Sequence, residues 1–315
     1  MIPRKIPFET VFTVSTLLYF LQSIQNEFYL SLELINGWFP SSLLKKIGLL
    51  GCGAMGTQIA LAIDSGKIDG TLTHVFDESK EAAQTLVSKL TNKPEIVENS
   101  HLLSSHPVNI VVEAASQDAV KDVGLSVLQN KRDLMIMSAG ALLDESIHDV
   151  LSDACKDFKK TIYLPSGAIA GLDGLKSVKD ELESISIATT KHPRSLEGAK
   201  FFETSEINLD EISSLTVIFE GTAKEAVSLF PANINVAALL SLSGIGSEKT
   251  RVKIVADPNT DKNTHQIEAS GQFGKMSFTI ENFPDPNNPK TSRLAILSAI
   301  ETLRKYCSDE IQIGT

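Results

Sequence analysis

The chain from residue 47 to residue 164 alternates short apolar runs with longer amphipathic segments. The apolar runs predict buried strands at 47–50, 72–76, 108–112, 133–138 and 161–164. Apolar residues at helical spacing predict helices after residue 56 and at 78–90, 117–129 and 144–158. Strands that alternate with helices through short connections are typical of a doubly wound parallel sheet, whose ligands bind beyond the carboxyl ends of the strands. We therefore predict an α/β fold with a site at that edge.

Beyond Gly171 the pattern changes to alternation of apolar and polar residues. This period of two predicts strands at 184–190, 251–256, 264–269 and 276–280, with a shorter candidate at 215–219. The last three of the longer strands follow one another through turn sequences, which indicates an antiparallel sheet with one covered face. An apolar helix at 232–242 is expected to cover it, and a final helix is expected at 291–306. We predict a second α+β domain with a mostly antiparallel sheet.

Residues 1–44 fit neither pattern. The apolar run 11–21 follows Arg4 and Lys5 as in a secretory signal, but no small-residue cleavage site follows it convincingly. The run is also too short and too often interrupted for a membrane-spanning helix, which needs about 20 residues. We expect an extension outside the fold, such as one that arises from an upstream start codon chosen in error. A membrane anchor or a targeting segment is the alternative.

The charge and the cysteine content exclude some classes of partner and of binding site. The chain has 29 Lys and Arg against 39 Asp and Glu, and its net charge of −10 argues against a nucleic-acid partner held through phosphates. Its three cysteines, Cys52, Cys155 and Cys307, show neither a disulfide pattern nor the spacing of metal ligands. We expect no bound metal, no nucleic acid and, for the folded part, no membrane. A reducing, cytoplasmic location fits.

Three glycines, Gly51, Gly53 and Gly56, stand at G-x-G-x-x-G spacing between the strand 47–50 and the following helix. In this arrangement one glycine permits a tight turn, one lets backbone approach a pyrophosphate, and one allows close packing of helix and strand. The phosphates then lie at the helix N-terminus. An ordinary turn is the alternative, but the flanking strand and helix favour a dinucleotide site.

Asp77 ends the second predicted strand, about 20 residues past Gly56. An acidic side chain at this position accepts hydrogen bonds from a ribose 2′-hydroxyl, and its charge repels a 2′-phosphate. We therefore predict NAD as the cofactor, while the nearby Lys80 leaves NADP open. The alternative role for Asp77 is to cap the next helix.

Small residues occupy three predicted strand ends, at 113–116, 138–141 and 165–171. Because the carboxyl ends of parallel strands meet at one edge, these segments would line a crevice in which a nicotinamide ring can lie flat. Each segment taken alone also suits a simple turn. Their recurrence at successive strand ends favours a site.

Few residues of the second domain stand out as chemical candidates. His265 shares a strand face with Ile267 and Ala269, which predicts a side chain that is either a packed core histidine or an acid/base group. Asn235, an amide in an apolar helix, is either a helix cap or a partner of the cofactor amide. Residues 290–292 are expected at the start of the last helix, where they either hold a carboxylate or simply cap the helix.

Several blocks taken together resemble the L-aspartate dehydrogenase family from Lys46 to Tyr306. The blocks are GCGAMG at 51–56, EAASQDAV at 113–120, SAGA at 138–141, PSGAIAGLD at 165–173, FPANINVAA at 230–238, NTHQI at 263–267 and NPKTSRL at 288–294. The resemblance implies NAD(P)-dependent oxidative deamination of L-aspartate, through iminoaspartate, to oxaloacetate and ammonia. In the family the imine can also feed quinolinate and hence NAD synthesis.

The resemblance assigns roles to individual positions. The active-site histidine of the family maps onto His265, where a near-neutral acid/base suits the proton transfers at the amine and at the water that attacks the imine. The cofactor-contacting alanine and asparagine of the family map onto Ala168 and Asn235. Together with the glycine loop and strand ends, the expected cofactor-binding residues are Gly51, Gly53, Ala54, Met55, Gly56, Asp77, Ala114, Ala115, Ser116, Ala168 and Asn235.

The resemblance also implies a Rossmann domain at 45–167, completed by the C-terminal helix 289–307, and a substrate-binding and dimerisation domain at 168–288 that forms a homodimer. Ala170 departs from the family pattern, which has a glycine there, so the geometry of its loop is in question. The match does not fix the ligands of the substrate carboxylates. The candidates are Lys290, Thr291, Ser292 and Lys191, with plain solvation as the alternative.

Two other functions remain open. A reductase of the dihydrodipicolinate or homoserine type shares the two-domain plan but would prefer a different acid. A non-catalytic NAD-binding sensor would bind cofactor without turning over any amino acid, although the retention of His265 within an otherwise complete site disfavours it. The expected partner of the chain is a small molecule, L-aspartate.

Overall fold

The computed structural model describes residues 44–231, 234–285, 288–308 and 311, with the side chains of residues 288–290 outside that description. Residues from Lys45 onwards form one compact unit. The expectations for residues 1–44 therefore fall, apart from Leu44, outside the described residues. None of the helices in the described ranges is long and apolar enough to cross a membrane.

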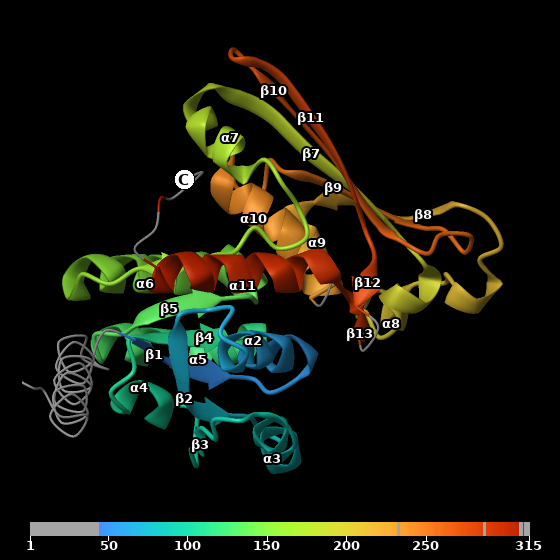
Figure 1. The fold of residues 1–315 in the computed structure, drawn as a ribbon. Coiled ribbons are helices and arrows are strands. Elements are labelled where there is room, and N and C mark those ends of the chain that lie inside the picture. The colour runs from blue at the N-terminus through green and yellow to red at the C-terminus, as the bar shows by residue number, and fades with distance from the viewer. Residues whose placement is uncertain (1–43, 232–233, 286–287, 309–310, 312–315) are drawn as a thin grey trace, which may run out of the picture. The chain divides into compact units, whose positions relative to one another are not determined.

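A six-stranded parallel sheet forms the first half of this unit (Figure 1). Its strands are β1 (Lys45–Leu50), β2 (Gly70–Phe76), β3 (Glu95–Ile96), β4 (Ile110–Glu113), β5 (Asp133–Ile136) and β6 (Ile162–Tyr163). The order β3-β2-β1-β4-β5-β6 reverses direction between β1 and β4. Such a reversal opens a crevice at the carboxyl ends of the strands. The predicted doubly wound sheet is confirmed, with the short β3 as an addition.

Helices cover both faces of the parallel sheet (Figure 1). They are α2 (Ala54–Asp64), α3 (Lys80–Lys89), α4 (Leu102–Ser105), α5 (Gln117–Gln129), the 3-10 helix η1 (Ala139–Leu143), α6 (Glu145–Phe158) and the C-terminal α11 (Arg293–Cys307). One apolar layer joins α2, α3 and α11 to the sheet, and another joins α4, α5 and α6 to its other face. Ser116 begins α5 by accepting a hydrogen bond from the Ala119 N–H (3.1 Å), and the helix then buries Val120, Val123 and Val127.

The second half contains a five-stranded sheet of order β11-β10-β7-β9-β8. Its strands are β7 (Leu182–Lys191), β8 (Thr216–Thr222), β9 (Arg251–Ala256), β10 (Asn263–Gly271) and β11 (Gly274–Asn282). Three of its four pairings are antiparallel and β7–β9 is parallel, so the prediction of a mostly antiparallel sheet is confirmed. The expectation that β9 and β10 are adjacent is wrong, because β7 lies between them and the connection 257–262 is long enough to cross it.

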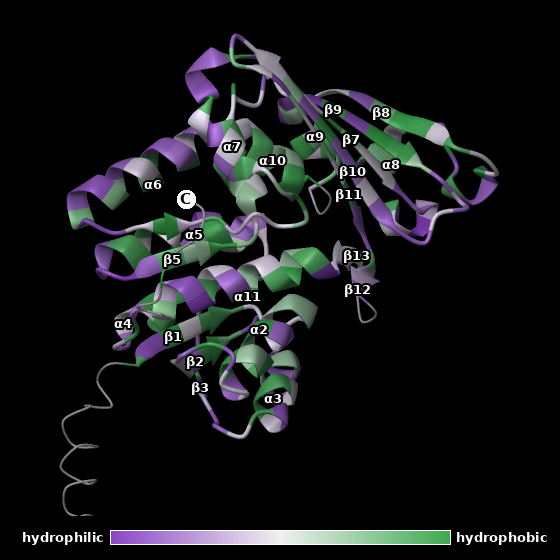
Figure 2. Cartoon of the chain, turned by 45° about the horizontal axis from the view of Figure 1, so that its top comes forward, coloured by the Kyte–Doolittle hydropathy of each residue, from purple (hydrophilic) through white to green (hydrophobic). Residues whose placement is uncertain are grey.

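Apolar helices cover one face of the second sheet, and polar residues such as Gln266 and Glu268 occupy the other. Helix α10 (Asn235–Ser243) is apolar over most of its length (Figure 2) and begins later than expected, while residues 232–233 lie outside the description. The remaining elements are α7 (Leu172–Ser177), η2 (Lys179–Glu181), η3 (Pro193–Leu196), α8 (Phe201–Thr204), η4 (Leu209–Glu211), α9 (Ala223–Leu229), β12 (Pro284–Asp285) and β13 (Asn288–Ser292).

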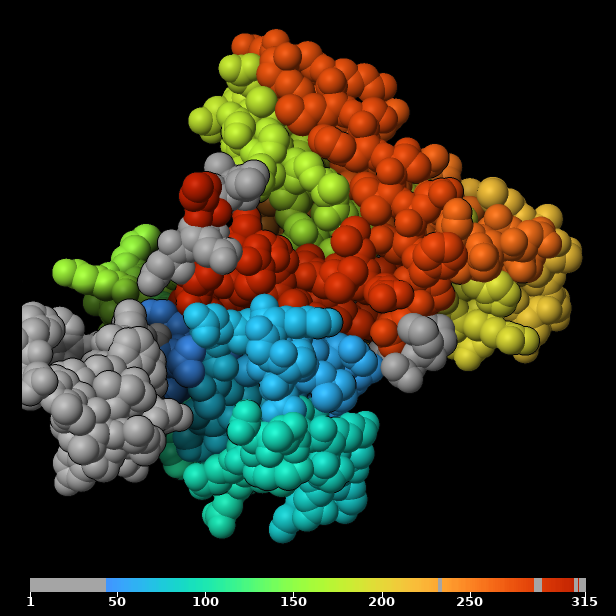
Figure 3. All heavy atoms as spheres, in the orientation of Figure 1, coloured from blue at the N-terminus to red at the C-terminus, as the bar shows by residue number. Residues whose placement is uncertain are grey.

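Helix α11 adjoins both halves. Its residues Ala299 and Leu303 are buried in the same core as Ile47 of β1, while Ala295 packs against the core of the second sheet. In the space-filling view the red atoms of α11 form a band between the blue atoms of α2 and the orange and yellow-green atoms of the second sheet and its neighbours (Figure 3). The end of the chain therefore helps to position the two halves of the site.

Candidate active site

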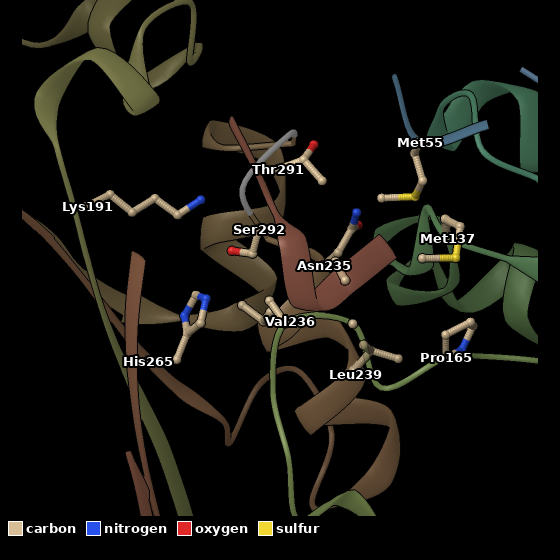
Figure 4. Close-up of a pocket in the computed structure, with 13 residues that line it drawn as sticks. Met55, Met137, Pro165, Lys191, Asn235, Val236, Leu239, His265, Thr291 and Ser292 are labelled. Carbon is tan, nitrogen blue, oxygen red and sulfur yellow. The ribbon is translucent and has the colours of Figure 1, made fainter. Parts of the chain in front are cut away.

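A pocket lies where the carboxyl ends of the parallel strands meet the second sheet (Figure 4). Its lining residues come from both halves of the chain and are Met55, Met137, Pro165, Gly167, Ala168, Lys191, Asn235, Val236, Leu239, His265, Thr291, Ser292 and Ala295. Met55 belongs to the first turn of α2, directly after the glycine loop, and His265 belongs to β10. The pocket thus connects the predicted nucleotide loop to the predicted acid/base.

The three glycines of the loop differ in how much space a side chain would find at each position. A Cβ at Gly51 would lie 2.6 Å from the Ala114 carbonyl oxygen, and one at Gly56 would lie 2.0 Å from the Gly51 oxygen, so close packing requires both glycines. A Cβ at Gly53 would meet nothing within 4 Å. The protein itself therefore does not require a glycine at 53, and the open space beside it at the N-terminus of α2 is what a phosphate group needs. Ala54 and Met55 place their N–H groups in that first turn.

Asp77 holds the glycine loop against the end of β2. Its Oδ2 accepts a hydrogen bond from the Cys52 N–H (2.7 Å), and its Oδ1 accepts one from the Ser79 N–H (2.8 Å). Ser79, and not Asp77, is the N-cap of α3, because its hydroxyl accepts from the Ala82 N–H (3.2 Å). The alternative capping role is thus taken by Ser79, and Asp77 lies beside the nucleotide loop. Burial raises the pKa of the neighbouring Cys52 thiol to about 12, with Asp77 as a second cause.

Two of the small strand-end segments make close contacts beside the glycine loop and the pocket. Ala114 and Ala115 form the wall behind the glycine loop, where their backbone atoms lie closest to Gly51. The Asn235 Oδ1 accepts a hydrogen bond from the Gly140 N–H (3.2 Å), which links α10 to η1 across 95 positions of sequence. Asn235 is the first residue of α10 and lines the pocket, so this hydrogen bond joins the two halves of the chain there.

The loop that contains Ala168 is fixed by polar contacts and tight packing. The Ala168 carbonyl accepts a hydrogen bond from Asn282 Nδ2 (2.8 Å), and Ala168 itself is buried. Gly171 has φ of 83°, and a Cβ there would lie 2.5 Å from the Phe278 ring. Ala170 is exposed and does not have a positive φ, so the departure from the family glycine introduces no backbone strain.

His265 is buried, with 2% of its surface exposed, and one ring nitrogen is already engaged. Its Nδ1 lies 2.9 Å from the Thr189 hydroxyl, on the residue directly opposite in β7. This contact orients the ring and leaves Nε2 as the nitrogen that a ligand in the pocket can meet. Sequence reasoning did not single out Thr189, although its place on the covered face of the same sheet was a usable signal.

Lys191 lies two residues beyond Thr189 on β7 and also lines the pocket. Burial lowers the pKa of the Lys191 ammonium to about 8, and it is 4% exposed. Burial lowers the pKa of His265 to about 3, and the charge of Lys191 adds to this, so the pKa lies well below the near-neutral value expected from the sequence. At neutral pH the pocket therefore holds a neutral imidazole beside a positive charge, which suits a carboxylate substrate.

The segment before α11 differs from the expected helix start. Thr291 lies in β13, which pairs with β12, and Ser292 takes the N-cap position of α11 without a side-chain cap bond. Both residues line the pocket, and the Ser292 hydroxyl accepts a hydrogen bond from Asn263 Nδ2 (3.2 Å). The side chain of Lys290 lies outside the description. The structure thus brings Thr291 and Ser292 to His265 and Lys191.

Burial of a neutral His265 predicts lower stability at acid pH. The native pKa is about 3 and the unfolded value is 6.5, so between these pH values the unfolded chain binds more protons and the free energy of unfolding falls as pH falls. At pH 5 this lowers it by about 2 kcal/mol relative to pH 7. Urea unfolding of the variant His265→Asn should show a drop between pH 7 and pH 5 that is smaller by that amount. Equal drops in the two proteins would contradict a buried neutral histidine.

Comparisons with known proteins show what the whole chain is similar to. Two family models match, "Aspartate dehydrogenase, C-terminal" over residues 173–306 and "Homoserine dehydrogenase, NAD binding domain" over residues 51–165. The chain is 82% identical over 272 residues to the L-aspartate dehydrogenase of Nitrosopumilus maritimus, covering 86% of this chain and 100% of that protein. It is 47% identical over 272 residues to the L-aspartate dehydrogenase of Methanococcoides burtonii, covering 86% of this chain and 99% of that protein.

A solved structure shows the same architecture. The aspartate dehydrogenase of Thermotoga maritima matches with a TM-score of 0.66 and 31% identity, covering 85% of this chain and 99% of that one. The scyllo-inositol dehydrogenase of Lactobacillus casei matches at a TM-score of 0.51 and 15% identity, which is a likeness of fold alone. The likeness to the first of these extends over both sheets, because it covers nearly all of that chain.

Proposed function

The chain belongs to the L-aspartate dehydrogenase family, and from this premise we propose that the pocket beside His265 oxidatively deaminates L-aspartate, through iminoaspartate, to oxaloacetate and ammonia. One observation carries the proposal: a single pocket joins Met55, next to the glycine loop, to His265 and Lys191 of the second sheet. A dehydrogenase needs its nucleotide end and its acid/base in one cavity. The product imine could also supply NAD biosynthesis, as it does in the family.

The residues at the nucleotide end fit a pyridine nucleotide. When bound, this cofactor supplies the hydride acceptor. The loop with Gly51, Gly53 and Gly56 would hold its pyrophosphate, and the open space beside Gly53 supports this. We propose NAD in preference to NADP because the Asp77 carboxylate lies beside the loop at the end of β2, where it would repel a 2′-phosphate. The nearby Lys80 would tolerate a 2′-phosphate, so NADP stays an alternative cofactor.

At the other end, small residues would adjoin the nicotinamide. The assigned positions are Ala114, Ala115, Ser116, Ala168 and Asn235. The support is that Ala168 and Asn235 line the pocket, while Ala114 and Ala115 form the wall behind the glycine loop. Ser116 caps α5 through its hydroxyl, so its contribution to the cofactor site would be through its backbone.

We assign the proton transfers to His265. If the Thr189 hydroxyl accepts the Nδ1 proton, the lone pair of Nε2 faces the pocket and can accept a proton from the substrate amine or from the water that attacks the imine. The Lys191 ammonium would bind a substrate carboxylate, with Thr291 and Ser292 as hydrogen-bond donors beside it. Lys290 belongs to the same segment and is a further candidate for the second carboxylate.

The alternative functions can be distinguished by the substrates that the protein turns over. The nucleotide half alone matches a homoserine dehydrogenase model, but residues 173–306 match the aspartate dehydrogenase model, and this favours L-aspartate as the substrate. The test is NADH formation by the full chain with L-aspartate, homoserine and L-malate, and the reverse reaction with oxaloacetate plus ammonia, using each cofactor. We expect turnover with L-aspartate and a preference for NAD. Turnover of homoserine alone would indicate the reductase type, and bound NADH without turnover of any of these would indicate a sensor.

We further propose the domain division, assembly and location that the family resemblance implies. Residues 45–167 with the C-terminal segment 289–307, which contains α11 (Arg293–Cys307), would form the dinucleotide-binding domain, and residues 168–288 would form the substrate-binding and dimerisation domain. Support comes from the two large sheets, since β1 to β6 fall within the first limits and β7 to β11 within the second, while β13 (Asn288–Ser292) crosses the boundary. A homodimer in the cytoplasm is the proposed form, and the three cysteines, all free, fit a reducing compartment.

A further inference from the structure

A buried glutamate that no step of the proposed reaction uses lies behind the pocket. Glu113 is the last residue of β4 and is fully buried. Its Oε1 accepts hydrogen bonds from the Ala115 N–H (2.8 Å) and the Ser138 hydroxyl (2.8 Å). Its Oε2 accepts from the N–H groups of Met137 (3.1 Å) and Ser138 (3.0 Å). One carboxylate thus satisfies four donors at the ends of two neighbouring strands.

This arrangement fits an ionised carboxylate. Three of the four partners are backbone N–H groups, which can only donate, while the fourth, the Ser138 hydroxyl, can donate or accept. The three backbone donors favour the ionised form of the carboxylate. Burial raises the pKa of Glu113, and the hydrogen bonds from Ser138, Ala115 and Met137 oppose that rise. Burying a charged carboxylate costs free energy. Its hydrogen bonds therefore must do what an apolar residue could not, which is to hold the donor groups in fixed positions.

The four donors belong to the two loops that flank the proposed nicotinamide site. Ala115 is part of the wall against which Gly51 packs. Met137 lines the pocket, and the same loop continues to Gly140, which donates to Asn235 of the pocket. The Ser138 hydroxyl donates to Glu113 and does not cap η1, although Ser138 is the N-cap residue. Glu113 therefore connects the wall behind the glycine loop to the wall that reaches Asn235.

We propose that Glu113 is a positioning residue that sets the spacing of these two loops and thereby the orientation of the nicotinamide half of the cofactor. The inference rests on the proposed function, because that function places the nicotinamide between the loops. A Gln side chain has the same shape, but its amide NH₂ would face N–H groups and repel them. A shift of about 1 Å in the position of a reacting group can cost about 100-fold in rate.

Asp133 offers a matched control at the opposite end of the same sheet. It is the first residue of β5, whereas Glu113 lies beside the other end of that strand. Its Oδ1 accepts from the Thr161 N–H (3.0 Å), and its Oδ2 accepts from the Tyr306 hydroxyl (2.9 Å). Asp133→Asn therefore disturbs a carboxylate that also joins strands and lies away from the pocket.

The test compares Glu113→Gln, Ser138→Ala and Asp133→Asn in the full chain. The measurements are kcat and KM for L-aspartate, thermal unfolding, and calorimetric Kd values for NADH and for ADP-ribose, which lacks the nicotinamide. Glu113→Gln is expected to lower kcat by about 10- to 100-fold and to weaken NADH binding relative to ADP-ribose binding. Ser138→Ala keeps the three backbone bonds and should give a smaller loss of the same kind. Asp133→Asn should lower stability without changing kcat or the ratio of the two Kd values.

The outcomes separate this inference from the proposed function. If Glu113→Gln keeps the kcat and the Kd ratio of the wild type, or if Asp133→Asn shows the same losses, Glu113 has a structural role only and the inference is overturned. If Glu113→Gln does not fold, an unchanged kcat in Ser138→Ala overturns it instead. A wild-type chain that fails to oxidise L-aspartate would refute the proposed function, while the ratio of NADH to ADP-ribose affinity would still report on Glu113.

Discussion

His265→Ala is expected to lower kcat for L-aspartate by about 10²- to 10⁴-fold, the usual contribution of a positioned acid/base group. The reason is geometric. Thr189 holds Nδ1 at 2.9 Å, so Nε2 is the ring nitrogen that can meet a substrate in the pocket. The loss should appear in kcat because the proton transfer belongs to the reaction and not to the binding of substrate.

Binding of the cofactor should survive this change. The glycine loop and Asp77 belong to the parallel sheet and make no hydrogen bond to His265. We expect the Kd for NADH, measured by calorimetry, to change by less than about three-fold. His148→Ala is the control, because that histidine is exposed on α6 and contacts its neighbour Asp149 (3.2 Å). An unchanged kcat in His265→Ala would remove the acid/base assignment, and a parallel loss of NADH binding would point to a damaged fold.

Local sequence signals predicted the nucleotide-binding half well. Helix α5 was predicted with its observed bounds, because Ser116 is a good N-cap and the buried valines recur at helical spacing. The glycine loop was recognisable because its G-x-G-x-x-G spacing lies between a predicted strand and a predicted helix. In the structure, close packing of Gly51 against Ala114 and of Gly56 against Gly51 leaves no room for a side chain. These features depend on contacts within one strand-loop-helix unit or between its nearest neighbours.

Long-range pairing was harder to predict. The period of two identified β9 and β10, but nothing in either strand shows that β7 lies between them. The same holds for the site, where the partner of His265 is Thr189, 76 positions away, and the partner of Asn235 is Gly140, 95 positions away. The predicted strand 184–190 stopped one residue short of Lys191, which the observed β7 includes and buries. A buried lysine at the end of such a strand is a signal for a functional charge.

Lys191→Met is expected to lower kcat/KM for L-aspartate by about 100-fold or more, mainly through a higher KM. Removing one partner of a buried, hydrogen-bonded charge pair costs about 2–5 kcal/mol, and in the proposed complex the other partner is a substrate carboxylate. Methionine has a similar length and no charge. Burial lowers the pKa of Lys191 from 10.5 to about 8, so the charged form is disfavoured in the folded chain.

Loss of that charge should therefore leave stability unchanged or raise it. We expect Lys191→Met to unfold at the same urea concentration as the wild type or at a higher one, which separates a binding role from a structural one. The pH dependence gives a second test. In the wild type kcat/KM should fall above about pH 8 as the ammonium loses its proton, and this fall should be absent in the variant.

The matched control is Lys253→Met on β9, in the same sheet. Lys253 pairs with Glu220 (3.4 Å) and faces away from the pocket, among the polar residues of the uncovered face. Its replacement should leave KM and the pH profile as they are, because an exposed ion pair contributes little. If Lys191→Met and Lys253→Met show the same KM for L-aspartate, the carboxylate is bound elsewhere. Thr291 and Ser292 would then be the next side chains to replace, since they line the pocket beside His265.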